Sequence, residues 1–163
     1  MLASAQSLID LLHLAPHPEG GFFRETFRAP LTLAGLPHGG RRSASTAIYF
    51  LLPAGAFSAF HRVRADEAWH FYDGDPLELH TLLADGTHRV ELLGRDWDAG
   101  QRPQTVVPAG VWQAAAPRGE GFSLVGCTVA PGFDFADFEM PPRAELLAAL
   151  PDHAEVIRRF SRA

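Results

Sequence analysis

Hydrophobic and polar residues alternate along the middle of the chain, and glycine or proline interrupts the alternation about every ten residues. This rhythm is typical of short strands in a sandwich or barrel. Residues 48–52 are nearly all apolar, as expected for a strand covered on both faces. Residues 57–63 alternate instead, which places His61 and Val63 on the same face. The pattern predicts strands at 22–29, 45–52, 57–63, 67–73, 77–83, 87–93, 104–107, 112–116 and 122–130.

The two ends of the chain have a helical pattern instead. Residues 4–14 carry apolar side chains along one side, and prolines end this helix. Residues 145–150 and 154–160 predict two more short helices, the second with a capping box from Asp152 to Glu155. Between the strands, Asp85-Gly86 is the strongest hairpin signal, because a type I′ turn needs positive φ. The sequence therefore predicts an all-β dominated fold with short terminal helices.

Composition narrows the class of protein. The chain has 163 residues, which suits one domain over 1–163 with a barrel core at about 20–140. A net charge of −5 speaks against a nucleic-acid partner, which would need a basic face. No apolar run is long enough to span a membrane, and the first residues lack the basic region of a signal peptide. With Cys127 as the sole cysteine there is no internal disulfide, and we expect a cytoplasmic protein.

The chain contains no lysine, since all 14 of its basic residues are arginine. This excludes Schiff-base chemistry, a lysine general base and a P-loop lysine.

Two sets of spacings between residues point to a possible site. Gly55 is followed by His61, Glu67 and Gly74 at intervals that resemble the first signature of the cupin superfamily, although Val63 stands where that signature has a second histidine. Residues 108–113 resemble the second signature, with Gln113 in place of its histidine. Two of the four ligands of a metal-binding cupin are therefore replaced.

A closer resemblance covers almost the whole chain, about residues 8–140. The segments 17–28, 45–52, 60–71 and 130–138 look like one small cupin family that is catalogued as a domain of unknown function. This resemblance implies a cupin-type double-stranded β-helix, also called a jelly-roll barrel, and usually a homodimer. It brings no established reaction.

His61 and Glu67 are the candidate catalytic residues. If they face each other across a pocket, Glu67 would raise the basicity of His61 and orient it as a general base. The alternative for His61 is a core histidine satisfied by hydrogen bonds. An altered metal site would use His61, Glu67, His70 and Gln113, although alternation sends His70 to the opposite face. No cofactor is firmly expected, and a divalent metal remains the alternative.

A second group of residues would bind the ligand. Trp69 and Phe71 share the face of Glu67, and core packing is their alternative role. Arg24 and Glu25 point to opposite faces, so that Arg24 either clamps an anionic substrate or lies on a solvated surface. The candidate ligand-binding residues are Arg24, Phe57, Trp69, Phe71, Trp112 and Gln113.

The phenylalanines at 133, 135 and 138 form a large apolar surface, which we expect to pack across the barrel mouth or a dimer interface.

Three functions remain open, and whether the protein is an enzyme is not decided by its sequence. The first is a metal-independent, isomerase- or epimerase-like enzyme acting on a small polar molecule such as a sugar or a sugar nucleotide. The second is a small-ligand-binding barrel without catalysis, and the third is a metal-dependent cupin enzyme. An acid partner for His61 across the pocket would favour the first over the second.

Overall fold

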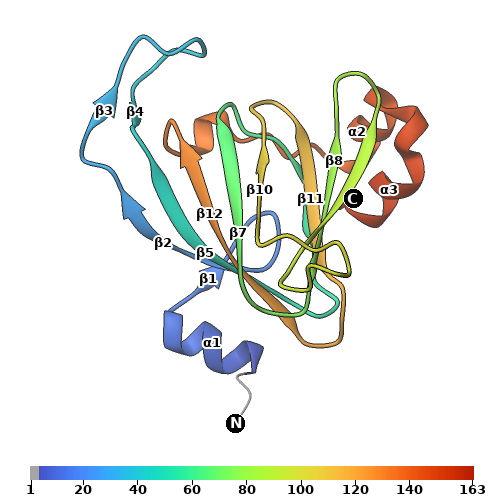
Figure 1. Cartoon of the computed structure of the whole chain (residues 1–163). Coiled ribbons are helices and arrows are strands. Elements are labelled where there is room, and N and C mark those ends of the chain that lie inside the picture. Colours follow the sequence, from blue (N-terminus) through green and yellow to red (C-terminus); the bar gives the residue numbers. More distant parts are fainter. Residues whose placement is uncertain (1–3) are drawn as a thin grey trace.

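The computed structural model describes residues 4–163, which form two facing antiparallel sheets with helices at both ends (Figure 1). The larger sheet contains, in spatial order, β1 (Ala15–Pro16), β2 (Phe22–Arg28), β5 (Thr46–Pro53), β12 (Phe122–Ala130), β7 (Asp66–Gly74) and β10 (Gln104–Val107). The smaller sheet contains β6 (Ser58–His61), β11 (Trp112–Pro117), β8 (Leu77–Leu82) and β9 (His88–Leu93). The predicted all-β class is confirmed, and each predicted strand corresponds to an observed one.

The connection between β2 and β5 is an arm, residues 29–45, that projects from the barrel (Figure 1). Its two short strands, β3 (Thr32–Leu33) and β4 (Arg42–Ser43), pair with each other. Neither was expected from the sequence, because two-residue strands leave no alternation to detect.

The helices flank the barrel. They are α1 (Ala5–Leu12), the 3-10 turn η1 (Phe135–Asp137), α2 (Arg143–Ala149), the 3-10 turn η2 (Pro151–His153) and α3 (Ala154–Arg159). The predicted capping box at Asp152 is wrong, because Asp152 lies inside η2 and α3 begins after His153 without a side-chain cap. No helix in the described part of the chain is long and apolar enough to cross a membrane.

The hairpin between β8 and β9 forms where Asp85-Gly86 predicted it. Its turn is not the expected type I′ form, because Gly86 has a positive φ of 83° but Asp85 does not. Instead the Gly86 N–H donates to the Leu83 carbonyl, and the Asp85 carboxylate accepts from the Thr87 N–H. The predicted position of the hairpin turn is therefore confirmed, and the predicted type I′ form is wrong.

Three apolar clusters hold these layers together. The central one lies between the two sheets and includes Phe50, Trp69 and Leu79. A second packs α2 and α3 onto the smaller sheet, with Phe160 at its centre. A third packs α1 against β5 and β12. The central cluster does not fill one end of the barrel, where a cavity remains.

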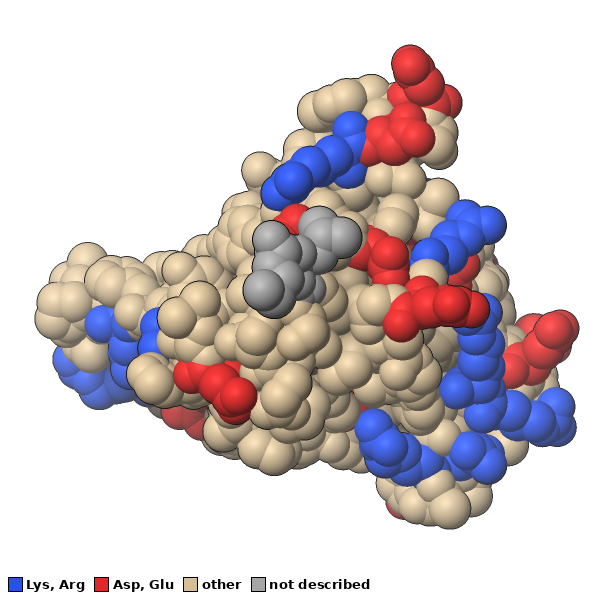
Figure 2. All heavy atoms as spheres, turned by 90° about the horizontal axis from the view of Figure 1, so that it is seen from below, with Lys and Arg blue, Asp and Glu red and all other residues tan. Residues whose placement is uncertain are grey.

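Charged side chains are mixed over the outer surface. On the face in Figure 2, arginines and acidic residues lie in neighbouring groups around a broad uncharged centre. This mixture agrees with the small net charge of −5.

Candidate functional site

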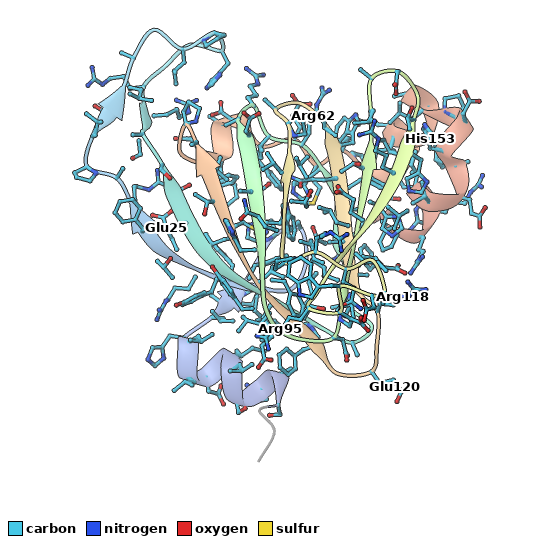
Figure 3. The ribbon with its side chains drawn as sticks, viewed as in Figure 1. Glu25, Arg62, Arg95, Arg118, Glu120 and His153 are labelled. Atoms are coloured by element: carbon cyan, nitrogen blue, oxygen red, sulfur yellow. The ribbon has the colours of Figure 1, made fainter. Side chains whose placement is uncertain are left out.

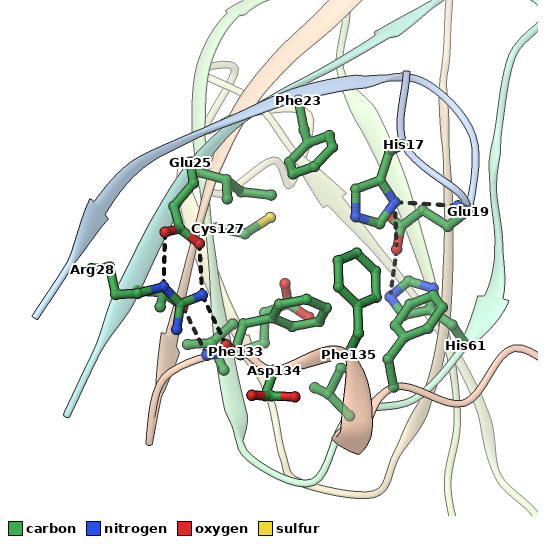
Figure 4. Close-up of a pocket in the computed structure, with 16 residues that line it drawn as sticks. His17, Glu19, Phe23, Glu25, Arg28, His61, Cys127, Phe133, Asp134 and Phe135 are labelled. Atoms are coloured by element: carbon green, nitrogen blue, oxygen red, sulfur yellow. Dashed lines mark hydrogen bonds and ion pairs between the residues drawn. The ribbon is translucent and has the colours of Figure 1, made fainter. Parts of the chain in front are cut away.

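A cavity of about 270 Å³ opens at one end of the barrel (Figure 4). Its walls come from β2, β5, β6, β7 and β12, from the loop before β2 and from the segment after β12. The lining residues are His17, Glu19, Phe23, Glu25, Arg28, Thr46, Ile48, His61, Val63, Glu67, Cys127, Val129, Phe133, Asp134, Phe135 and Phe138. Polar groups thus converge in a mostly apolar pocket, as in small-molecule sites generally.

Glu19 and His61 form the central contact of this cavity. Glu19 Oε2 lies 3.2 Å from His61 Nε2 and 3.6 Å from His17 Nδ1. Ser58 donates a hydrogen bond of 2.9 Å to the other carboxyl oxygen, Oε1. His61 Nδ1 lies 2.8 Å from the carbonyl of Ala59, which can only accept, so Nδ1 carries a proton. Both nitrogens of the imidazole are therefore engaged.

The Glu19–His61 pair must hold a second proton. Without it, the lone pairs of His61 Nε2 and Glu19 Oε2 would face each other in a buried contact. Burial raises the pKa of Glu19 to about 8, against a smaller lowering by the Ser58 hydrogen bond. Burial also lowers the pKa of His61, so the proton belongs to the carboxyl group. At neutral pH the Glu19–His61 pair has no net charge, and the proton of its carboxyl group can be donated to a ligand.

A glycine-rich loop delivers Glu19 to this position. The Ala59 N–H donates to the Glu19 carbonyl, which brings the loop against β6. Gly20 has a φ of 118°, and a Cβ there would collide with the Phe57 carbonyl oxygen. Only glycine fits such a close backbone approach. The sequence predicted the loop but not its acid, so Glu19 is the functional residue that was missed.

Glu67 lines the same cavity from β7. Its Oε2 accepts a 2.5 Å hydrogen bond from Gln113 Nε2, and Trp69 Nε1 donates a 2.9 Å hydrogen bond to Gln113 Oε1. Burial raises the pKa of Glu67, while its hydrogen bonds with Gln113 and Cys127 lower it in part. Glu67 is thus a buried carboxyl group that accepts hydrogen bonds, and His61 makes its close contact with Glu19 instead of Glu67.

The residues do not fit a cupin metal. The indole N–H of Trp69 only donates, so the oxygen of Gln113 must face it and the amide N–H must face Glu67. The oxygen of Gln113, the only atom of this amide that could ligate a metal ion, is therefore occupied by Trp69, and its N–H group is occupied by Glu67. His70 lies on the opposite side of its sheet, where its Nε2 contacts Thr128 Oγ1. No group of three or more His, Cys, Asp or Glu side chains among residues 4–163 is arranged to hold a metal ion.

Three phenylalanines that line the cavity, Phe133, Phe135 and Phe138, pack edge to face on one another, and we call them the aromatic cap. Figure 4 shows Phe133 and Phe135 on the side of the cavity opposite Phe23. Phe138 stacks on the His61 ring, with 5.4 Å between ring centroids. The arm anchors the cap, because Arg42 pairs with Asp137 through two hydrogen bonds of 2.7 and 2.8 Å. Of the two placements expected for these phenylalanines, the barrel mouth agrees with their position in the cavity lining, and the dimer interface stays a prediction.

Phe135 provides a test of the cap, because 54% of it is exposed. Replacing Phe135 with Ala is expected to open the mouth and speed alkylation of the cavity thiol, Cys127, by about tenfold, while unfolding changes little. Mass spectrometry measures the rate cleanly, because Cys127 is the sole cysteine. Trp97→Ala, at an exposed site outside the cavity lining, should leave the rate unchanged. Equal rates in all three proteins would show that Phe135 does not restrict access.

The other predicted ligand-binding residues lie around the cavity and do not line it. Trp69 and Phe71 belong to the central core, as the alternative interpretation held. Phe57 and Trp112 pack toward the C-terminal helices. Arg24 points away and lies over the ring of Tyr49, whereas Glu25 and Arg28 line the cavity. Of the two orientations considered at 24–25, the inward residue is therefore Glu25.

The comparisons with known proteins agree with this architecture. The family model described as "Cupin superfamily (DUF985)" matches residues 6–141. The Saccharomyces cerevisiae protein YML079W is 34% identical over 150 residues, which cover 83% of this chain and 74% of that protein. A structure of a hypothetical protein from Leishmania major has a TM-score of 0.94 at 35% identity, covering 99% of this chain and 100% of that one.

The structure of protein SO0799 from Shewanella oneidensis has a TM-score of 0.90 at 42% identity and covers 99% of both chains. More distant cupins share the fold alone. The two-sheet barrel is accordingly a cupin jelly roll, and the chain belongs to the DUF985 family of the cupin superfamily.

Proposed function

We propose that this cupin binds a small polar molecule in its cavity and transfers protons to and from it without a metal, as isomerases and epimerases do. The observation that carries the proposal is the 3.2 Å contact between Glu19 and His61, which holds a proton between two buried side chains of the cavity. Glu67 supplies a second proton-transfer group in the cavity lining. Acid and base are thus both available.

The reaction would use the two carboxyl groups in opposite roles. Glu67, as carboxylate, takes the proton from a carbon next to the ligand's carbonyl group, and the C–H electron pair forms an enol double bond. The carbonyl oxygen takes the proton stored on the Glu19–His61 pair. If that carbon also carries a hydroxyl group, the intermediate is an enediol. Glu67 then returns its proton to the former carbonyl carbon, and the Glu19–His61 pair regains a proton from the other hydroxyl group, whose O–H electron pair forms the new carbonyl. A raised pKa makes Glu67 a stronger base than an ordinary carboxylate.

Neither of the two tyrosines of the chain, Tyr49 and Tyr72, lines the cavity, so the acid of the proposed reaction is not a tyrosine of the lining. The Glu19–His61 pair takes that role in our proposal.

Deuterium exchange tests this proposal directly. The protein is incubated in D2O with small carbonyl compounds, both charged and uncharged, and loss of each C–H signal is followed by proton NMR. We expect at least one compound to exchange about 100-fold faster than in buffer, in line with the size of general acid–base effects. His61→Gln should abolish most of this acceleration while the protein still folds.

His153→Gln is the matched control, because His153 lies outside the cavity lining (Figure 3). If His61→Gln catalyses deuterium exchange as fast as the wild type does, the proposal is wrong. Binding without exchange would favour the second candidate, a barrel that holds its ligand without converting it. That candidate rests on the buried, hydrogen-bonded state of both nitrogens of His61.

A further inference from the structure

We propose that the cavity selects uncharged molecules of about monosaccharide size that carry hydroxyl or carbonyl groups, and that it rejects phosphate esters, carboxylates and nucleotides. This inference deepens the proposed function, on which it rests for the location of the ligand. It sets aside the sugar nucleotide among the ligands that the sequence suggested.

The first reason is that the described lining of the cavity offers no free cation. Arg28 is the one arginine among these lining residues, and Glu25 engages it twice, by hydrogen bonds of 2.9 and 2.8 Å. The same guanidinium donates a 3.0 Å hydrogen bond to the Phe133 carbonyl. Figure 4 shows this pair turned toward each other at the side of the cavity away from Glu19. An incoming anion would have to displace Glu25.

The second reason is that the other titratable groups of the lining are neutral or acidic. Burial lowers the pKa of His17 to about 4, so its imidazole is uncharged at neutral pH. The Glu19–His61 pair has no net charge, as argued above. Glu67 and Asp134 add only carboxyl groups. A buried anion without a compensating cation is strongly disfavoured.

The third reason is size and surface. A volume of about 270 Å³ lies just below the range of roughly 300–1,000 Å³ that is usual for pockets of drug-sized ligands. A nucleotide, with its base, sugar and phosphate, is larger. Hydrogen-bonding groups lie at two sides, around Glu19 and around the Glu25–Arg28 pair, with Phe23 and the aromatic cap between them (Figure 4). The ligand therefore needs polar groups at its edge and an apolar face.

Binding of matched pairs tests the selectivity without requiring turnover. One pair is a monosaccharide and its phosphate ester, and another is a sugar lactone and its carboxylate. Titration followed by ligand-observed NMR is expected to show binding of at least one uncharged member, and its charged partner should bind at least tenfold more weakly. Tighter or equal binding of the charged member, or binding of neither member of any pair, would overturn the proposal.

A variant should reverse the selectivity. Glu25→Gln removes the partner of Arg28 and leaves its guanidinium free for an anion. We expect inorganic phosphate to raise the Tm of Glu25→Gln but not that of the wild type, because a ligand that binds the folded state stabilises it. Glu120→Gln is the matched control, because it removes the same charge from an exposed site (Figure 3). A double variant, Glu25→Gln with Arg28→Gln, should lose the phosphate effect.

If phosphate has the same effect on Glu25→Gln and on the wild type, the role given to Arg28 is wrong. The selectivity and the proposed function can fail separately. Uncharged ligands that bind without deuterium exchange would contradict proton transfer and leave the selectivity intact. Deuterium exchange of anionic compounds by the wild type would contradict the selectivity and leave proton transfer intact.

Discussion

Replacing Glu19 with Gln is expected to remove most of a decline of about 2 kcal/mol in the free energy of unfolding that the Glu19 carboxyl group causes between pH 6.5 and 8. The folded-state pKa of Glu19, about 8, lies above the ordinary value of 4.5. The folded protein therefore holds a proton that the unfolded chain releases, and the free energy of unfolding falls as the pH rises through this window. An amide carries no such proton.

The window is chosen so that the buried histidines do not interfere. The pKa of His17 is lowered from 6.5 to about 4, and the pKa of His61 is also lowered. Their effect is opposite in sign, because the unfolded chain binds their protons more tightly, but it ends near pH 6.5. Above that value, Glu19 and Glu67 shift stability in the same direction, and comparison of the variant with the wild type isolates Glu19.

The glutamine introduced by Glu19→Gln can retain the packing of the protonated acid. Its amide oxygen can accept from Ser58, and its N–H can donate to His61 Nε2, as the carboxyl group does. Chemical denaturation at several pH values measures the effect, with Glu120→Gln as an exposed control. A wild-type stability that stays flat from pH 6.5 to 8 would show that Glu19 is ionised in the folded protein.

The barrel could be predicted because its signals are local. Each turn carries its own glycine or proline, and each strand its own alternation, so the sequence located the strands without knowing their partners. The spacing of the cupin signatures placed Glu67 and Gln113 in one environment, and the hydrogen bond between them confirms it.

The site was harder to predict because it depends on contacts between distant segments. Glu19 lies in a loop without periodicity and reaches His61 only because the loop packs against β6. The signal available in the sequence was the pair Gly20-Gly21, which marks a close backbone approach beside an acid. Alternation separated Arg24 from Glu25 but could not say which faces inward, since that depends on how β2 pairs with β5.

Alternation also limits which aromatic residues can reach the interior. Trp112 and Gln113 are neighbours on β11, so they point to opposite faces of the sheet. Because Gln113 faces Glu67, Trp112 must face outward, and there it contacts the guanidinium of Arg62. Both residues were predicted as ligand contacts, and neither lines the cavity: Trp112 faces outward, and the buried amide of Gln113 is taken up by Trp69 and Glu67.

Replacing Gln113 with Leu is expected to destabilise the protein by about 3 kcal/mol. The change leaves two buried polar groups, the Trp69 N–H and the Glu67 carboxyl group, without their hydrogen-bond partner. Gln113 is fully buried and joins Trp69 to Glu67. Leucine fills a similar volume without hydrogen bonding, so Glu67 loses the donor that favours its carboxylate form. The pKa of Glu67 should therefore rise further, and proton transfer that uses it as a base should slow.

A double-mutant cycle separates the polar contact from packing. If the penalty comes from the stranded carboxyl group, Glu67→Leu combined with Gln113→Leu should recover more than half of the lost stability, because two facing apolar groups leave no buried acid. Thermal and chemical denaturation of the four proteins gives the coupling. If the losses of stability from the two single changes simply add, Gln113 contributes through its shape alone. The hydrogen bonds that link Trp69, Gln113 and Glu67 would then have no effect on the basicity of Glu67.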